Sequence, residues 1–470
     1  MRRIKQISVT NLFGMFNHVI PLHMDERITI IHGPNGFGKT ILLKMLSELF
    51  SPYDLSQLFN QRNVALRTIP FNEFNIDFDD ASGLRIVRHP QASRVLISDR
   101  ERSIPQLIFS SVDNNPEEQS FACNLKPSFL SVRMAMTDGQ KRMPFIEQMV
   151  PAIERMMPEL ERVDYESWRY LPTGETLSVN ELLERFGTQL PLDVPKEPDW
   201  LRDVRKTLSV RFIETQRLSS SMKPGSFVEA GKQPIAEPTV TVYSKELIET
   251  IKTKLAESVA LSQSLDRTFP ARIVDPKARR HSITEDELRK KLVELEKKRT
   301  HLMATGLLDK DNDAAFQVGD QIDDSTKVAL SIYVEDTEKK LGVFDKLANK
   351  IDTMTRIINK HFLYKRMTIS KEHGFVFTNS DGITLLATDL SMGEQHELVL
   401  FYEFLFNTTP GSLILIDEPE ISLHVVWQEQ FLDDVQEINQ LVHLDILLAT
   451  HSPDIINDRR DLIVELEEPK

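Results

Sequence analysis

The sequence predicts an α/β protein in which a mixed sheet carries an antiparallel β-subdomain and helical insertions. Short apolar runs at 28–31, 413–416 and 446–449 are of the kind that forms buried parallel strands. Apolar and polar residues alternate over 74–78, which is typical of a half-exposed antiparallel strand. Between these ends the chain has long stretches with helical periodicity, so we expect helices inserted into an α/β head.

The alternating stretches divide the chain into expected parts. Ile4, Ile7 and Val9 follow a strand rhythm, and further strands are predicted at 84–87 and 95–97. We expect five parts in the order N-terminal lobe, helical insertion, return strand with a glutamine loop, helical insertion and C-terminal lobe. Their boundaries are 1–130, 131–205, 206–243, 244–362 and 363–470.

Two stretches have helical patterns. Apolar residues from Met143 to Ile153 form one stripe, so the chain is expected to be helical over about 131–186. Phe344, Leu347, Ile351, Met354 and Ile358 step by three and four, and leucines over 288–302 nearly match them. Two interpretations remain open here: an antiparallel helix pair forming a short coiled-coil arm, or ordinary packing in a compact domain.

Composition places the chain among globular proteins of a reducing compartment. It has 470 residues, of which 40% are hydrophobic and 27% charged, and one cysteine, Cys123. No segment approaches the roughly 20 apolar residues of a membrane helix, and the N-terminus does not resemble a signal peptide, so we expect a cytoplasmic protein without membrane contact. The net charge of −14 argues against a broad DNA-coating surface.

The segment Gly33–Thr40 fits the pattern G-x-x-x-x-G-K-[ST] between a predicted strand and a predicted helix at 41–50. Glycines let backbone N–H groups converge on phosphates, and the helix N-terminus adds positive potential. Lys39 is expected to contact the β- and γ-phosphates of ATP, and Thr40 to bind Mg²⁺ through its hydroxyl. The residues of this loop that we expect to bind ATP are Asn35, Gly36, Gly38, Lys39 and Thr40.

Two later segments carry groups suited to phosphate chemistry. Asp417 and Glu418 end a predicted buried strand, where an aspartate suits magnesium coordination and a glutamate suits a general base. His451 follows the next predicted strand, where a sensor of the γ-phosphate would belong. A lone histidine in that position is more often structural, and the alternative for the carboxylates is an acidic turn.

A second anion site is predicted at 391–395, where Ser391, Gly393 and Glu394 precede a helical run over 396–406. A serine and a glycine at a helix N-terminus suit an anion. The spacing alone does not say which nucleotide this site serves.

The order of these motifs resembles the ABC-type ATPase superfamily. The segment 418–424 and the Pro-Asn-Gly of the phosphate loop look like the soluble RecF/SMC/OLD branch, because transporter chains usually have an aspartate where His424 stands. The resemblance implies a P-loop ATPase head that hydrolyses ATP with Mg²⁺, with Glu418 and His451 as catalytic residues. Met392 fills a position where small residues are common.

The resemblance also implies roles across a subunit interface. Ser391 and Gly393 would hold the γ-phosphate of the ATP bound by another copy, which makes a head-to-tail homodimer or a higher even oligomer. Gln216 looks like the glutamine that contacts Mg²⁺ and the attacking water; the alternative is a loop glutamine without a role. The turn at 421–424 would couple the two sites.

Within this branch, 212–218 together with the Leu423-His424 turn looks most like the Septu antiphage-defence ATPases of the PtuA type. That resemblance implies a separate HNH nuclease subunit, with any contact to DNA made indirectly. OLD-type nucleases continue into a Toprim domain, for which the 19 residues after His451 leave no room, so no intrinsic nuclease domain is expected. The alternatives are a RecF/SMC-like DNA repair or DNA-binding ATPase, and a nucleotide-gated scaffold with negligible turnover.

Overall fold

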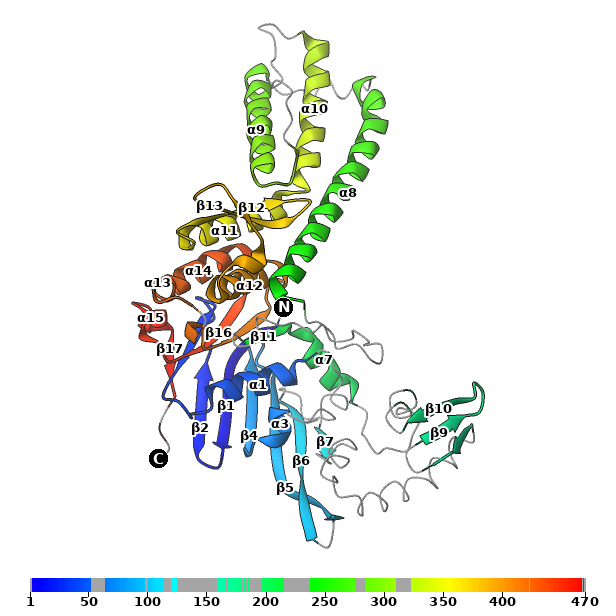
Figure 1. The fold of residues 1–470 in the computed structure, drawn as a ribbon, viewed down its shortest axis with the longest axis vertical. Helices are drawn as coiled ribbons and strands as arrows, with labels where there is room; N and C mark the ends of the chain where they lie inside the picture. Colours follow the sequence, from blue (N-terminus) through cyan, green and yellow to red (C-terminus); the bar gives the residue numbers. More distant parts are fainter. Residues whose placement is uncertain are drawn as a thin grey trace. The chain divides into compact units, whose positions relative to one another are not determined.

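The computed structural model divides the chain into two compact units, Met1–Phe212 with Leu462–Lys470, and Ile213–Asp461. Figure 1 labels their elements. Gln216 and the loop around it lie outside the described residues, as does Ser422. The structure describes residues 2–51, 64–97, 100–112, 120–124, 159–164, 167–178, 181, 185, 197–214, 237–274, 284–309, 323–421, 423–466 and 468.

The first unit contains a six-stranded antiparallel sheet in the order β2-β1-β4-β5-β6-β7. On β4 the apolar residues Phe74, Ile76 and Phe78 are buried and alternate with half-buried polar ones, as the period of two predicts. The strands are β1 (Ile4–Leu12), β2 (Phe16–Pro21), β4 (Glu73–Phe78), β5 (Gly83–Ile97), β6 (Arg100–Val112) and β7 (Ser120–Asn124). The two strands expected at 84–87 and 95–97 are therefore one strand, β5, whose register with β6 shifts between His89 and Ser93.

The same unit positions the glycine-rich loop between a strand and a helix. Strand β3 (Ile28–His32) pairs in parallel with β17 (Ile463–Glu465). Helix α1 (Lys39–Leu49) follows the loop and buries Leu42, Leu43 and Leu46, of which the last lies four and three residues after the other two. Two shorter helices, α3 (Ala65–Thr68) and α7 (Asp199–Thr207), complete the described part of this unit's helices.

The prediction that the first insertion is helical is wrong for part of its length. The described residues 159–164 and 167–178 contain a small antiparallel sheet of β8 (Leu160–Arg162), β9 (Ser167–Tyr170) and β10 (Glu175–Ser178). The strand residues Leu160, Trp168 and Leu177 are buried, and Gly174 turns the chain with φ +71°. Such short strands give too few alternations to outweigh the neighbouring helical pattern. The stripe from Met143 to Ile153 lies outside the described residues.

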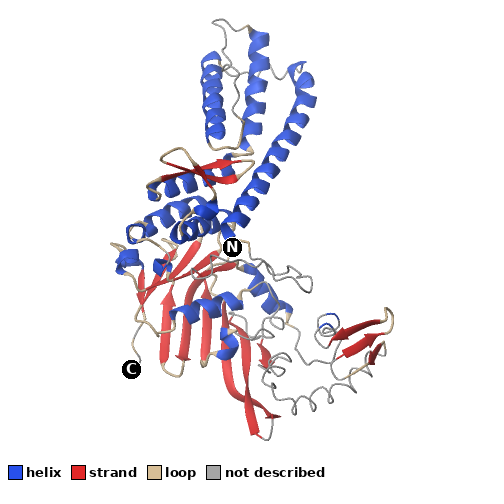
Figure 2. Cartoon of the chain, in the orientation of Figure 1, coloured by secondary structure: helices blue, strands red, loops and turns tan. Residues whose placement is uncertain are grey.

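The second unit has a parallel strand pair packed with helices, and a small antiparallel sheet (Figure 2). Strands β15 (Leu413–Asp417) and β16 (Asp445–Thr450) pair in parallel, and only Asp417 among their residues is not buried. Three helices of this unit pack on one another: α11 (Asp345–His361), α12 (Met392–Phe406) and α14 (Phe431–Val442). The small sheet consists of β12 (Lys365–Ser370), β13 (Gly374–Asn379) and β14 (Thr384–Leu385).

Several other described elements are short. They are β11 (Val210–Glu214), the helices α13 (Val425–Gln428) and α15 (Pro453–Ile456), and the 3₁₀ turns η3 (Ala387–Asp389), η4 (Pro419–Ile421) and η5 (Arg460–Leu462). Among the residues that the structure describes, no helix has the length and apolar character needed to span a membrane. The α/β fold class that the sequence predicts is thus confirmed. The structure has parallel strand pairs, an antiparallel sheet and inserted helices.

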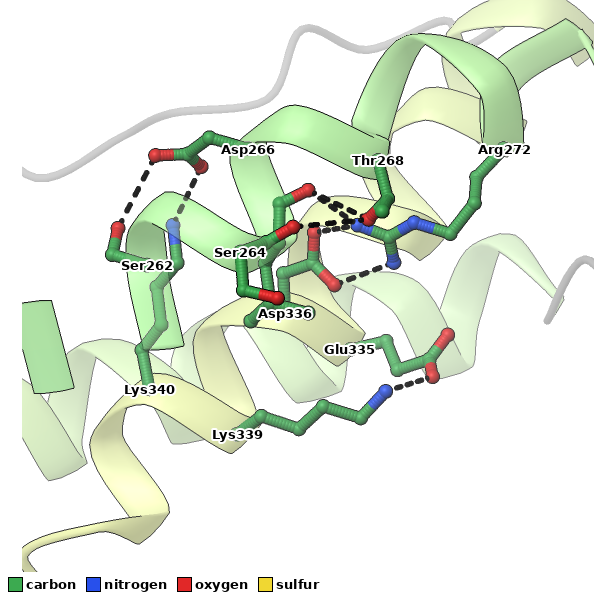
Figure 3. Close-up of polar contacts among 10 residues, drawn as sticks. Ser262, Ser264, Asp266, Thr268, Arg272, Glu335, Asp336, Lys339 and Lys340 are labelled. Atoms are coloured by element: carbon green, nitrogen blue, oxygen red, sulfur yellow. Dashed lines mark hydrogen bonds and ion pairs between the residues drawn. The ribbon is translucent and has the colours of Figure 1, made fainter. Parts of the chain in front are cut away.

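Three further helices extend the second unit, namely α8 (Thr239–Val274), α9 (Glu285–Ala304) and α10 (Asp324–Gly342). Helix α10 packs against both α8 and α9. Figure 3 shows the polar contacts between α8 and α10: the guanidinium of Arg272 donates to both carboxylate oxygens of Asp336, at 2.6 and 2.5 Å, and Lys340 Nζ donates to Asp266 at 3.0 Å. A bidentate pair of this kind fixes the relative register of two helices.

Of the two interpretations left open for this region, the antiparallel pairing of the two apolar stripes is wrong. Residues Phe344, Leu347, Ile351, Met354 and Ile358 are buried, but their helix α11 packs against β12, α12 and α14. Leucines of α9 are buried too, and α9 packs against α10. An apolar stripe shows which face of a helix is buried, but it does not identify the partner. The chain therefore forms a three-helix extension beside a packed α11, and not one antiparallel pair.

Candidate functional site

The loop between β3 and α1 depends on two glycines with left-handed backbone. Gly36 and Gly38 have φ +90° and +87°, conformations that side chains with a Cβ adopt at a cost. A Cβ at Gly38 would also lie 2.7 Å from Leu12 Cδ2, inside van der Waals contact. Gly38 is the N-cap of α1, so the first N–H groups of that helix face the loop. The sequence thus builds a backbone cradle of the type that binds phosphates.

Lys39 closes this loop. Its side chain is buried, and its Nζ donates to the carbonyl of Gly33 at 2.6 Å and to that of Pro34 at 3.1 Å. An ammonium group is therefore held over the loop, next to the N-terminus of α1, whose first turn contains no acidic residue. Thr40 follows in the first turn of the same helix. This arrangement places positive charge where the loop can receive an anion.

His18 supports the loop from β2, and sequence reasoning missed it. Its ring is buried, and Nε2 lies 2.9 Å from the carbonyl oxygen of Phe37. Burial lowers the pKa of His18, and the bond to Phe37 opposes this only in part, so the neutral ring donates Nε2–H to the carbonyl. The ring of Phe16 lies 5.1 Å from that of Phe37. The only sequence signal was a histidine at an inward position of an alternating strand.

The second unit brings the predicted acid and histidine together. In the β15–β16 pair, Asp417 lies opposite Ala449, so the residues that follow both strands leave the same edge. Glu418 turns with φ +46°, a rare conformation for a residue with a side chain, and its N–H donates to Ala449 O at 2.8 Å. As a result, Glu418 Oε1 lies 3.8 Å from His451 Nδ1.

Glu420 also faces the histidine, and sequence reasoning gave it no role. Its carboxylate is buried, and Oε1 accepts the hydroxyl of Thr450 at 2.8 Å and the backbone N–H of His451 at 3.1 Å. The same oxygen lies 3.1 Å from His451 Nδ1. The available signal was its place two residues after Glu418, at the edge where the parallel strands end.

The predicted second anion site lies at the N-terminus of α12. Ser391 is the N-cap: its hydroxyl accepts the N–H of Glu394 at 3.4 Å, and its own N–H donates to Glu394 Oε2 at 2.7 Å. Gly393 lies between them, in the first turn. Met392 is 59% exposed, so the side chain that departs from the usual motif does not enter the core.

Lys365 on β12 completes this site. Its Nζ donates to both carboxylate oxygens of Glu394, at 2.8 and 2.6 Å. Burial raises the pKa of Glu394, but Lys365 and Ser391 outweigh it and hold that pKa below its ordinary value. The carboxylate is thus charged and neutralised by Lys365, and the helix N-terminus remains suited to an anion.

The turn after the acidic strand caps a short helix. His424 is the N-cap of α13, and its ring nitrogen Nδ1 accepts the N–H of Val426 at 3.4 Å. Gln428 Nε2 donates to the carbonyls of Glu420 and Leu423, at 3.2 and 3.1 Å. These bonds anchor the turn that carries Glu420.

The predicted site residues therefore fall into three groups, and Gln216 lies outside the described residues. Asp417, Glu418 and His451 are brought together by β15 and β16. Ser391, Gly393 and Glu394 form the N-terminus of α12. Asn35, Gly36, Gly38, Lys39 and Thr40 form the loop of the first unit.

The donor chemistry fits the expected cofactor. The first unit has the hydroxyl of Thr40 and the second has the carboxylate of Asp417, and each is by itself a hard oxygen donor of the kind that Mg²⁺ takes beside nucleotide phosphates. The left-handed glycines Gly36 and Gly38 leave backbone N–H groups in the loop, which are donors of the kind that bind phosphates.

Comparison with known families matches residues 260–457 to a model described as "AAA domain, putative AbiEii toxin, Type IV TA system". The matched range begins within α8 and includes α12, β15, Glu418 and His451. It does not include the loop at 33–40. This part of the chain is therefore similar to an AAA-type ATPase domain. A search of curated proteins found no match.

Similar solved structures are distant. The Smc head domain with an extended coiled coil bound to the C-terminal domain of ScpA, from Pyrococcus furiosus, is 12% identical with a TM-score of 0.35, covering 100% of this chain and 94% of that one. The SMC head domain from Thermotoga maritima is 11% identical with a TM-score of 0.31, covering 98% and 94%. A further SmcHead, bound to the C-winged helix domain of ScpA, is 9% identical with a TM-score of 0.33, covering 98% and 93%.

Proposed function

We propose that this chain is an ABC-type ATPase that binds ATP with Mg²⁺ and hydrolyses it. The observation that carries the proposal is the edge of β15 and β16, where Glu418 and His451 lie 3.8 Å apart, in a chain that also has a phosphate loop. A carboxylate and an imidazole at the carboxyl ends of parallel strands suit proton transfer and contact with a phosphate.

Each residue has a distinct part in the proposed reaction. The loop N–H groups and Lys39 bind the phosphates, and Glu418 accepts a proton from the attacking water. His451 contacts the terminal phosphate, and Gln216 helps to orient the water. Mg²⁺, when bound by Thr40, Asp417 and Gln216, neutralises charge on the phosphates.

We further propose that two copies close head to tail around ATP. The N-terminus of α12 offers N–H groups and the hydroxyl of Ser391 to an anion, and Lys365 neutralises Glu394, the acidic side chain of its first turn. A second anion site of this kind suits the γ-phosphate bound by the other copy. The assembly would then be a homodimer or a higher even oligomer.

The biological role that we propose is antiphage defence of the Septu type, in which nucleotide state regulates a separate HNH nuclease. The resemblance of the sequence motifs to the PtuA type supports it. The matched family model is described as a putative toxin of a type IV toxin–antitoxin system. A nucleotide-dependent toxin component is therefore a second candidate. Co-expression with a neighbouring nuclease separates the two, because only the first requires that partner for toxicity.

A DNA-repair or DNA-tethering ATPase is the third candidate. It requires direct, salt-sensitive binding to duplex DNA. The net charge of −14 weighs against such binding. Stimulation of ATP hydrolysis by duplex DNA, lost at high salt, would favour this candidate over the first.

The proposed nucleotide site is tested by ATP binding to the purified chain. Lys39→Ala removes the ammonium from the loop and should weaken ATP binding at least 100-fold, since charge-assisted bonds to phosphate are among the strongest polar contacts. Lys44→Ala, a little more than one turn further along α1, is the matched control and should bind as the wild type does. Equal affinities of all three proteins would reject the site.

A further inference from the structure

The carboxylate of Glu420 is built into the edge that carries His451. Its side chain is 8% exposed, and one oxygen, Oε1, faces three groups: the hydroxyl of Thr450, the backbone N–H of His451 and the ring nitrogen Nδ1 of His451. The backbone of Glu420 is held as well, because Gln428 Nε2 donates to its carbonyl. Contacts to the carboxylate and to the backbone carbonyl of Glu420 therefore fix the direction of its side chain.

This geometry decides which ring nitrogen carries a proton. The backbone N–H of His451 can only donate, so Oε1 acts as an acceptor at this place. Nδ1 lies 3.1 Å from the same oxygen, and it satisfies an acceptor only as Nδ1–H. Nε2 is then the nitrogen left to meet a ligand, and the ring is 46% exposed. When the ring carries a second proton, Nε2 is also protonated and can donate to an anionic oxygen of a ligand.

The two glutamates after β15 are not equivalent toward the ring. Nδ1 lies 3.1 Å from Glu420 but 3.8 Å from Glu418. Glu420 stands in the 3₁₀ turn η4, and its carboxylate also accepts the hydroxyl of Thr450 and the backbone N–H of His451. The ring is thus held by Glu420, and this separates the orientation of the histidine from the carboxylate proposed as the base.

We propose that Glu420 is a positioning residue that holds His451 as the Nδ1–H tautomer and directs Nε2 toward the terminal phosphate of ATP. This inference rests on the proposed ATPase function for its consequence in catalysis, but not for the tautomer itself. It adds a residue to the site that acts through His451 and touches neither nucleotide nor water.

The tautomer is tested by ¹⁵N NMR on the nucleotide-free full chain labelled in its histidines. The signals of His451 are assigned by their loss in His451→Asn. The wild type should show protonated Nδ1, and Glu420→Ala or Glu420→Leu should shift the ring to the Nε2–H form that free imidazole side chains favour. Glu420→Gln should keep Nδ1–H, because the amide oxygen still accepts. Glu429→Ala, at an exposed glutamate, is the control. An unchanged tautomer in both variants without an acceptor overturns the inference.

The second test is a double-mutant cycle on ATP hydrolysis. Glu420→Ala should lower kcat roughly 10- to 100-fold, the range for groups that orient a functional histidine, and leave the KM for ATP within about twofold. Glu420→Gln should recover part of kcat. In a His451→Ala background, Glu420→Ala should have no further effect, whereas a merely structural role gives losses that multiply. Losses that multiply overturn the inference. Wild-type protein without turnover would reject the proposed function, and the NMR result would still decide the tautomer.

Discussion

The ammonium of Lys365 on β12 lies 2.6 Å from Glu394 Oε2 in the first turn of α12. Glu394 in turn accepts the N–H of Ser391, so one carboxylate joins the N-cap of α12 to a neighbouring sheet. This pair places a negative side chain at a helix end that we propose receives a phosphate. Lys365 makes the two compatible because it cancels the charge of the carboxylate.

Removing that cation should weaken closure around ATP. Lys365→Met leaves Glu394 without its counter-ion, so we expect ATP-dependent association of two copies to weaken about tenfold through repulsion of the phosphate. Lys365→Arg should restore it. The control is Lys371→Met. Lys371 lies in the turn after β12 and pairs with Asp309, and this variant breaks that pair. Analytical ultracentrifugation measures the association, and equal dimer fractions for Lys365→Met and Lys371→Met would contradict the prediction.

The proposed contact of Ser391 with a phosphate can be tested separately from its function as a helix cap. Aspartate is as good an N-cap as serine, so Ser391→Asp should keep the thermal stability of the chain. It also places a negative charge where the terminal phosphate is expected, so ATP-dependent association should fall at least tenfold. Ser391→Ala should instead lower stability by about 1 kcal/mol through loss of the cap. A Ser391→Asp protein that associates like its parent would show that no phosphate meets this helix.

A buried ion pair supports the helix that follows the phosphate loop. Arg205 and Glu197 are 4% and 1% exposed and 2.6 Å apart, and the guanidinium also donates to the carbonyls of Leu49 and Ser51 at the end of α1. Arg205→Met leaves a buried carboxylate unpaired, and we expect a loss of about 3–5 kcal/mol in the free energy of unfolding.

The control for this prediction is a more exposed ion pair on the same helix α7. Arg202 pairs with Asp199, and their side chains are 31% and 89% exposed. Arg202→Met should cost less than about 1 kcal/mol. Urea unfolding measures both values, and the double variant Arg205→Met with Glu197→Met should regain part of the loss. Equal costs for the two arginines would refute the assignment of a structural role to Arg205.

The stability of the second unit should depend on pH through His361. Its ring is buried between Glu397, which accepts from Nδ1, and Asp434, 2.9 Å from Nε2. Burial by itself would lower the pKa of His361, but the bonds and charges of the two carboxylates outweigh it and raise the pKa to about 9, from 6.5. The folded state therefore binds the proton more tightly than the unfolded chain does.

The sign of the effect follows from that difference. The stabilisation is fully present below about pH 6.5 and is lost as pH rises toward 9, by at most about 3 kcal/mol. His361→Gln should remove this part of the slope of unfolding free energy against pH. His443→Asn, at an exposed histidine whose left-handed backbone suits asparagine, should keep it. A slope that survives His361→Gln would contradict the prediction.

The sequence predicted those elements of the fold that depend on residues close together in the chain. The buried runs at 413–416 and 446–449 form β15 and β16, and the strand–loop–helix context of the phosphate loop is present. The sheet at 159–178 was missed because its three strands are short. The partners of α11 were missed because periodicity identifies a buried face and not what covers it.

The site was predictable to the extent that motifs carry it. Glu418 and His451 were named from the ends of two strands, and the register of the parallel pair brings them together. Glu420, Lys365 and His18 were not named, because each acts through a contact with a residue at least 19 positions away in sequence. Such contacts follow from the fold and leave no spacing to recognise.

The measurement that tests the account most directly is the fate of ATP on Glu418→Gln compared with the wild type. Loss of the proposed base should leave ATP binding intact, reduce turnover at least 100-fold and hold two copies together around unhydrolysed ATP. Release of phosphate measures turnover, and size-exclusion chromatography with nucleotide analysis of the dimer peak measures the other two. A Glu418→Gln protein that hydrolyses ATP at the wild-type rate, or that stays monomeric with ATP bound, would contradict the assignment of Glu418 and the closure of two copies around the nucleotide.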